Sequence, residues 1–92
     1  MDAPKYELET SSKFERQYKK LSQTQKIQAK LVINRLLCDL PLEAKHKDHK
    51  LVGNYNGYRE CHIMPDLLLI YKKDNEALSL FCIRIGSHSN LF

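Results

Sequence analysis

The segment from Ser22 to Pro41 constrains the fold of this 92-residue chain more than any other part of it. Ser22 and Gln25 have the spacing of a helix-capping box, and Pro41 ends the pattern that follows them. Apolar residues recur between them at intervals of three and four, which indicates one face of an α-helix; they are Ala29, Val32, Ile33, Leu36, Leu37 and Leu40. The segment therefore predicts an amphipathic helix that packs on a core and leaves a basic outer face to solvent.

A shorter helix is predicted just before it. Ser12 and Glu15 repeat the capping-box spacing, and Phe14, Tyr18 and Leu21 form one stripe behind them. The two helices together indicate a helical hairpin. Further upstream, apolar residues alternate with polar ones over residues 6–8, which favours a short first strand.

The second half of the chain predicts strands. Residues 58–64 alternate, with Tyr58, Glu60, His62 and Met64 on one face and Arg59, Cys61 and Ile63 on the other. The continuous apolar run 67–71 is typical of a central strand, and residues 78–85 form another strand. Residues 51–52 are a candidate short strand before the turn at 53–57. Tight turns between these strands favour an antiparallel meander.

These elements predict an α+β fold for a single domain over residues 1–92. The expected order is β-α-α-β-β-β, with a helical hairpin packed on one face of an antiparallel sheet and the other face partly open. A chain of this length buries only about 60–65% of its unfolded surface, so a large internal cavity is not expected. Any site should be a shallow groove, which suits a polymer better than a small metabolite.

Charge and cysteine content narrow the function classes. The formal charge is +4, which favours nucleic acid or an acidic protein as a partner, although many small proteins are mildly basic. Cys38, Cys61 and Cys82 are widely spaced among apolar residues, so we expect buried free thiols and a reducing compartment. No signal peptide or membrane span is indicated, and the expected location is the cytoplasm.

Histidines are the candidate catalytic residues, because imidazole exchanges protons near neutral pH. His62 lies in the alternating strand beside Glu60, and Asp66 follows after a turn; His62 could instead be a hydrogen-bonded core residue. His88 lies beyond the last strand, sharing parity with Arg84 if the alternation continues, or it is a solvated tail residue.

The basic run 45–50 contains His49 and could contact a phosphate backbone or be an ordinary exposed loop. His46 and His49 are three residues apart, with Cys61, His62 and Asp66 further on, so a zinc site must be considered. Lysines flank both histidines of this run and disfavour a divalent cation. We therefore expect no metal and no other cofactor.

Three blocks resemble the YafQ branch of the RelE/ParE toxin superfamily in sequence and spacing. They are Asp48-His49-Lys50-Leu51, the run from Gly57 to Tyr71 and the run from Arg84 to Phe92. The combined pattern is specific, whereas no single block would be. One departure is Leu67, which stands where the family often has an aromatic residue, commonly Trp, after the aspartate.

The resemblance implies a bacterial type II toxin that cleaves mRNA in the translating ribosome and is neutralised by a cognate antitoxin. Its functional positions fall on His49, His62, Asp66, His88 and Phe92, with Arg59 and Arg84 as candidate phosphate contacts. Lys47 and Lys50 of the basic run are further RNA-binding candidates. The expected partners are the antitoxin, as a hetero-oligomer, mRNA and the ribosome.

A metal-independent mechanism follows from these residue types. A base takes the proton of a ribose 2′-hydroxyl, an acid protonates the leaving 5′ oxygen, and cations stabilise the phosphorane. His62 and His88 are the expected proton-transfer residues, with Asp66 assisting and His49 as a further acid–base or phosphate-binding group. Arg59 has the opposite parity to His62, so it could instead serve the structure. Phe92 could stack on a base.

Two other function classes fit the same fold. A ParE-like inhibitor of DNA gyrase would be a binding protein with no need for acid–base residues, so the histidine set argues against it. A plain nucleic-acid-binding or regulatory module, with incidental histidines, is the third class.

Overall fold

The computed structural model describes residues 3–92. Three helices and five strands make up the fold, together with two 3₁₀ turns. In chain order they are β1 (Glu7–Thr10), α1 (Ser12–Lys19), α2 (Gln23–Leu37), η1 (Ala44–His46), β2 (His49–Lys50), η2 (Gly53–Tyr55), β3 (Arg59–Met64), β4 (Leu67–Asp74), β5 (Ser79–Gly86) and α3 (His88–Leu91). The α+β class and the helical hairpin are confirmed. The second strand was expected at residues 51–52, but it is His49–Lys50.

The sheet is mixed rather than antiparallel, which corrects the sequence prediction. Its strand order is β1-β5-β4-β3-β2, and β1 pairs in parallel with β5 while the other pairs are antiparallel. The hairpin of α1 and α2 is the crossover that brings the chain from β1 back toward the sheet, as parallel pairing requires. The apolar run predicted as a central strand forms β4, which is the middle strand of the sheet.

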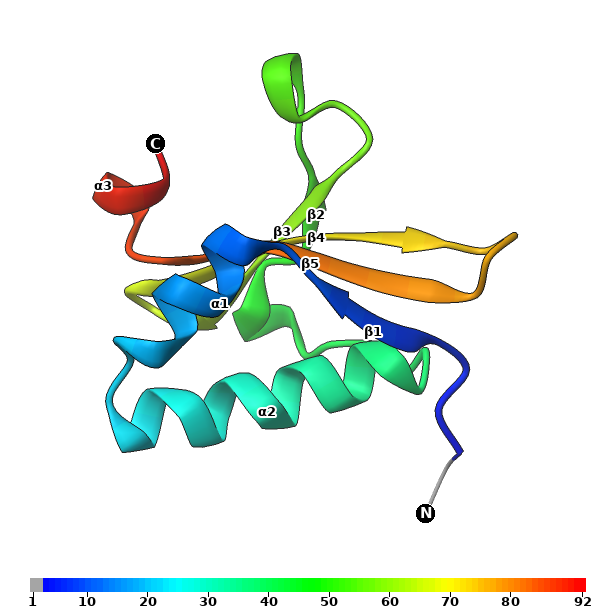
Figure 1. The fold of residues 1–92 in the computed structure, drawn as a ribbon, viewed down its shortest axis with the longest axis horizontal. Helices are drawn as coiled ribbons and strands as arrows, with labels where there is room; N and C mark the ends of the chain where they lie inside the picture. The colour runs from blue at the N-terminus through cyan, green and yellow to red at the C-terminus, as the bar shows by residue number, and fades with distance from the viewer. Residues whose placement is uncertain (1–2) are drawn as a thin grey trace.

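Each face of the sheet has its own apolar cluster. The larger one lies under α1 and α2 and includes Phe14, Leu36, Leu69 and Tyr71. The smaller one is built on the other face from Leu68, Ile70 and Leu91, with partly buried neighbours from residues 51–58. Figure 1 shows α2 along one side of the sheet and the segment around η2 rising on the opposite side, with α3 near it. Because β4 is covered on both faces, its sequence is continuously apolar.

Helix α2 ends three residues earlier than the periodicity indicated. Asp39 adopts a left-handed conformation with φ of 56°, and the N–H groups of Asp39 and Leu40 donate to the carbonyls of Leu36 and Arg35. This pattern is a Schellman cap. The Asp39 carboxylate accepts from Lys73 and from Lys5, at 2.8 and 3.2 Å, and these contacts lower the pKa of Asp39. Leu40 therefore lies beyond the helix end, although it continues the apolar spacing.

Two of the three cysteines are buried as expected, and Cys38 is not. Cys61 and Cys82 have no exposed surface and belong to the larger cluster, whereas Cys38 is partly exposed at the end of α2. Burial raises the pKa of the Cys61 thiol and raises that of Cys82 to about 12. Both buried thiols are therefore held in the unreactive protonated form near neutral pH.

No helix within residues 3–92 is long and apolar enough to cross a membrane.

Candidate active site

The candidate site lies on the face of the sheet opposite α1 and α2. A row of directly paired residues runs across four strands there, from His49 through Glu60 and Ile70 to Arg84. The next row runs from His62 through Leu68 to Gly86. Adjacent strands are about 4.8 Å apart, so the backbones of His62 and Gly86 are separated by about 10 Å. Strand pairing alone therefore places two predicted histidines and an arginine on one surface.

The first group of site residues is His49, Glu60 and His62. The His49 Nε2 lies 3.6 Å from Oε1 of Glu60, and the His62 Nε2 lies 3.8 Å from the same oxygen. The Glu60 side chain is only 8% exposed, whereas those of His49 and His62 are 50% and 26% exposed. Both imidazoles can therefore meet a ligand from solvent, while the carboxylate behind them is shielded. His62 is not a fully buried core residue, which removes that alternative.

The second group surrounds the short helix α3. The Phe92 ring lies 5.1 Å from the His88 ring and 5.8 Å from Tyr55, measured between centroids. The Arg84 guanidinium donates to the hydroxyl of Tyr55 at 3.3 Å and to the carbonyl of Asn90 at 3.2 Å. Phe92 remains 55% exposed, so one part of its ring is open to a ligand. Arg84, His88 and Phe92 are thus brought together, with Tyr55 among them.

The prediction that side chains alternate along one strand from Arg84 to His88 is wrong. Strand β5 ends at Gly86, Ser87 caps α3 by accepting from the N–H of Asn90, and His88 is the first residue of that helix.

A register shift in β4–β5 pairing explains why Arg84 reaches the site face at all. Tyr71 pairs with Cys82 but Ile70 pairs with Arg84, so Ile83 is the extra residue of a bulge. Bulges redirect side chains in this way, and Arg84 lies opposite the helices although Cys82 faces them.

A second bulge changes the face of Met64. His62 pairs with Leu68 and Met64 with Leu67, so Ile63 is extra in β3. Met64 therefore packs with the helix-side cluster instead of sharing the face of Glu60 and His62 as predicted.

Asp66 lies at the turn between β3 and β4. It is exposed and lines a cleft of about 550 Å³ together with Gln17, Gly86, Ser87 and Asn90. Its near neighbours are thus the end of β5 and the start of α3, beside His88. A role for Asp66 is compatible with the second group of site residues rather than with the first.

Arg59 and Lys50 point to the other face of the sheet. They are paired in register, and Arg59 pairs in turn with Tyr71, which packs under the helices. The Arg59 guanidinium donates to Asp48 at 3.2 and 3.3 Å, and the Tyr71 hydroxyl donates to Asp48 at 2.5 Å. The Asp48 contact raises the pKa of Arg59. Arg59 therefore anchors the loop that precedes His49, which is the structural alternative that its parity indicated.

The loop before His49 contributes Lys47 and a histidine that the sequence reasoning left without a role. Lys47 has a left-handed φ of 46°, and it lines a cleft of about 400 Å³ beside His46 and His62. The Nδ1 of His46 donates to the backbone carbonyl of His62 at 2.6 Å, which ties the loop to strand β3.

Glu60 and Tyr55 were also missed as site residues. Glu60 could have been found from the sequence, because it shares a strand face with His62. Tyr55 could not, because only the folded chain brings it to the site.

No group of three or more His, Cys, Asp or Glu side chains that could hold a metal ion is present in residues 3–92. The histidine pair with one carboxylate, beside an arginine, is an arrangement suited to proton transfer at a phosphate.

Comparison with known proteins identifies the class. The fold is RelE-like, that of small toxins with a helical hairpin on one face of the sheet. The family model described as bacterial toxin of type II toxin-antitoxin system, YafQ, matches residues 6–92. The chain therefore belongs to the YafQ family of type II toxins.

Individual relatives agree with this assignment. The mRNA interferase toxin YafQ of Escherichia coli K12 is 47% identical over 53 residues, which are 58% of this chain and 55% of that protein. The E. coli DinJ–YafQ toxin–antitoxin complex contains a chain that is 34% identical, with a TM-score of 0.82 over 96% of this chain and 98% of that one. A metal-bound toxin from Helicobacter pylori is 39% identical, with a TM-score of 0.80 over 92% and 97%. The curated relative is thus matched over about half its length.

Proposed function

We propose that this chain is an mRNA endoribonuclease that acts as the toxin of a toxin–antitoxin pair, with ribosome-associated mRNA as its substrate. The observation that carries the proposal is the placement of His49, His62, Arg84 and the α3 residues on one open face of the sheet. A relative of this chain is named an mRNA interferase, which supports the choice of RNA. A gyrase inhibitor of the same fold would have no use for this set of acid–base groups.

The reaction requires two proton transfers around one phosphate. A neutral imidazole takes the proton of the 2′-hydroxyl, the 2′-oxygen attacks phosphorus, the bond from phosphorus to the 5′-oxygen breaks, and an acid protonates that oxygen. We assign these transfers to His62 and His88, with His49 as a further acid–base group and Asp66 assisting near α3. The products are a 2′,3′-cyclic phosphate and a 5′-hydroxyl.

Other residues bind the substrate in this proposal. Arg84 contributes a guanidinium whose Nε is buried without a hydrogen-bond partner among the described residues, so the group is held by its two Nη atoms. It stabilises the extra negative charge of the phosphorane. Lys47 contacts the RNA backbone, and the open part of the Phe92 ring stacks on a base. Arg59 acts indirectly, through Asp48 and the His49 loop.

The first prediction concerns the reaction products. We expect purified protein added to ribosomes programmed with mRNA to produce fragments that end in a 2′,3′-cyclic phosphate or 3′-phosphate, because the 2′-oxygen is the nucleophile. A matched message with a single 2′-deoxynucleotide at the cleaved position should remain intact there. If the protein also cuts RNA in the absence of ribosomes, that cleavage should persist in EDTA. Fragments with 3′-hydroxyl ends, or trapped gyrase–DNA complexes beside intact mRNA, would refute the proposal.

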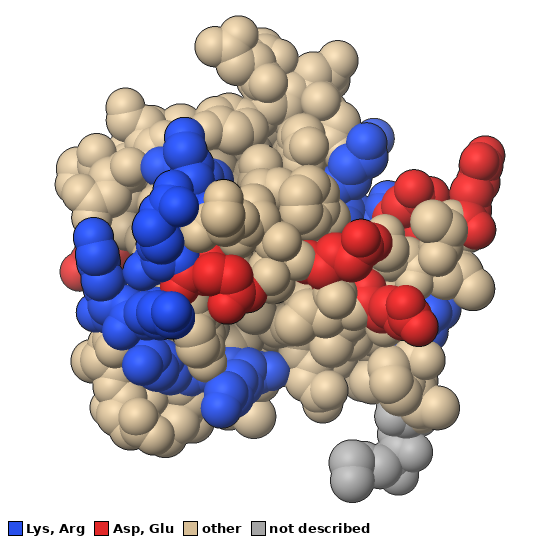
Figure 2. Space-filling model, viewed as in Figure 1, with Lys and Arg blue, Asp and Glu red and all other residues tan. Residues whose placement is uncertain are grey.

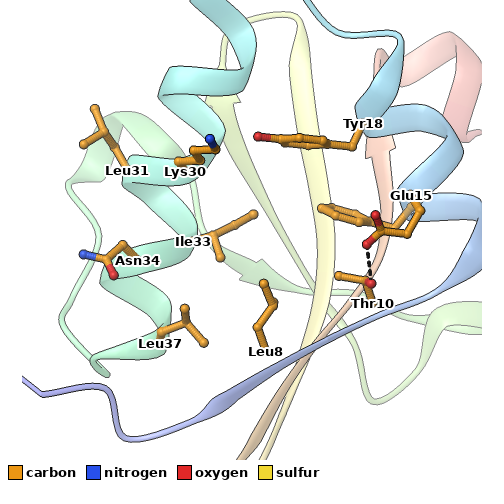
Figure 3. Close-up of a pocket in the computed structure, with 10 residues that line it drawn as sticks. Leu8, Thr10, Glu15, Tyr18, Lys30, Leu31, Ile33, Asn34 and Leu37 are labelled. Atoms are coloured by element: carbon orange, nitrogen blue, oxygen red, sulfur yellow. Dashed lines mark hydrogen bonds between the residues drawn. The ribbon is translucent and has the colours of Figure 1, made fainter.

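The antitoxin is the proposed protein partner, and we propose a groove on the helix side as its docking surface. An apolar groove of about 590 Å³ lies between β1, α1 and α2, with Leu8, Ile33 and Leu37 along it (Figure 3). Leu8 and Leu31 at this groove are 47% and 58% exposed, so the groove presents apolar surface to solvent. Lys and Arg side chains gather over α1 and the nearby start of α2 (Figure 2). An amphipathic segment with acidic polar residues would complement both features.

The second prediction tests this surface. We expect Leu31→Glu to weaken binding of the antitoxin encoded beside this chain by at least about 10-fold in calorimetry, because it places a charge in the apolar groove. RNA cleavage should be retained, since the groove lies on the helix side. Val52→Glu is the matched control, because Val52 is 84% exposed and lies in the segment on the other face. If Val52→Glu lowers the affinity for the antitoxin more than Leu31→Glu does, the antitoxin binds on the histidine face instead.

A further inference from the structure

Glu60 is a charged residue buried in the mostly apolar interior of the sheet. It is 6% exposed, and Ser79 is the other buried polar residue among residues 3–92. An ionised carboxylate that is removed from water is destabilising unless charged or hydrogen-bonding groups compensate it. A carboxylate at position 60 therefore needs compensating contacts that a leucine or valine there would not need.

The ionisable side chains nearest to the Glu60 carboxylate are two histidines on neighbouring positions. His49 is directly opposite Glu60 in the β2–β3 register, and His62 follows Glu60 by two residues on the same face of β3. Both Nε2 atoms approach one oxygen, Oε1, at 3.6 and 3.8 Å. Each imidazole thus presents its Nε2 atom to the same carboxylate oxygen.

The tautomer of His49 follows from its other contact. Its Nδ1 lies 2.6 Å from the carbonyl oxygen of Lys47. A carbonyl only accepts hydrogen bonds, so Nδ1 carries a proton and Nε2 is the basic atom of the neutral ring. A proton taken up at Nε2 becomes an N–H that faces Glu60, and the positive charge that appears on the ring then lies beside a fixed negative charge.

No lysine or arginine competes for this carboxylate in the described chain. Arg59 is paired with Asp48 on the opposite face, and Arg84 is separated from Glu60 by Ile70 and donates to Tyr55 and Asn90. The charged and titratable groups that face Glu60 are therefore His49 from β2 and His62 from β3, with Tyr58 just before β3 and Arg84 beyond Ile70 on β5. Strand β4 contributes only apolar side chains at this point.

We propose that Glu60 is a positioning residue that serves His49 and His62 together. Its carboxylate orients both Nε2 atoms and stabilises the imidazolium that forms when either ring accepts a proton. The two histidines consequently behave as a unit rather than as independent groups. The kinetic part of this proposal rests on the RNA-cleaving function proposed above.

The test compares Glu60→Gln, Glu60→Asp and Ser79→Ala with the parent protein. Gln preserves the volume and removes the charge, Asp preserves the charge on a shorter chain, and Ser79→Ala alters the other buried polar residue away from the histidines. We expect Glu60→Gln to lower kcat for mRNA cleavage about 10- to 100-fold, by analogy with the loss of a group that orients a metal-ligating histidine. KM should be unchanged because Glu60 is shielded from the RNA. Glu60→Asp should regain part of the lost kcat.

A second readout does not depend on cleavage. In ¹⁵N spectra of the histidine rings at pH 7, Glu60→Gln should move the signals of His49 and His62 together, while those of His46 and His88 stay in place. Ser79→Ala should move none of the four. The proposal is overturned if the His49 and His62 signals stay unmoved, if only one ring responds, or if Glu60→Gln retains the parent kcat. If the parent protein cleaves no RNA but both ring signals respond, the positioning role stands and the proposed reaction fails.

Discussion

His62→Ala is expected to reduce mRNA cleavage by at least about 100-fold while the protein remains folded, because removal of a general acid or base typically has an effect of this size. The His62 side chain is 26% exposed and faces away from the helices, so truncation opens no cavity in the larger apolar cluster. Single-turnover cleavage of mRNA on ribosomes measures the loss. His62→Gln should be equally impaired, since its amide cannot transfer the proton.

Folding must be measured on the same samples. The urea midpoint of His62→Ala should lie close to that of the parent protein, within about 0.5 kcal/mol in the free energy of unfolding, as for most substitutions outside a packed core. A fully active His62→Ala protein would show that the proton is transferred by another group, such as His49. A variant that unfolds at much lower urea would instead show that His62 is needed for structure.

Leu36→Ala is expected to lower the free energy of unfolding by about 2–5 kcal/mol, the range observed when a buried leucine is truncated and leaves a cavity. Leu36 is 1% exposed and lies in the larger cluster between α2 and the sheet. A loss of this size is a large fraction of the stability of a small domain. Equilibrium unfolding in urea, followed by circular dichroism, measures it.

Leu31→Ala is the matched control, because the same substitution is made on the same helix at a residue that is 58% exposed. It should change the free energy of unfolding by no more than about 0.5 kcal/mol. Equal losses for the two variants would mean that α2 does not bury the stripe that its sequence indicates.

Local patterns predicted the helices because their signals depend on nearby residues. The capping box at Ser22 and Gln25 forms as expected, and the stripe from Ala29 to Leu36 is buried. The helix end was missed because Asp39 takes the left-handed position that glycine usually occupies at such caps. What holds Asp39 there is a pair of lysines distant in sequence, which no local pattern reveals.

Side-chain parity predicted most of the candidate site and failed where the strands bulge. Glu60 and His62 share a face as expected, because residues two apart in a regular strand point the same way. Met64 and Arg84 depart from simple alternation because an extra residue precedes each of them in the pairing. A bulge is decided by how two strands fit against each other, so it is not visible in either strand alone.

The sequence by itself determined the fold class, the helical hairpin, the central strand and the histidines, because these depend on short-range periodicity and on residue chemistry. Only the tertiary structure decided that β1 pairs in parallel with β5, that Arg59 is committed to Asp48, and that Glu60 lies between His49 and His62. Each of these facts joins segments that are distant in the chain or depends on a register between strands. Such contacts are selected by the burial of one face of the sheet as a whole, so they follow from packing rather than from local sequence.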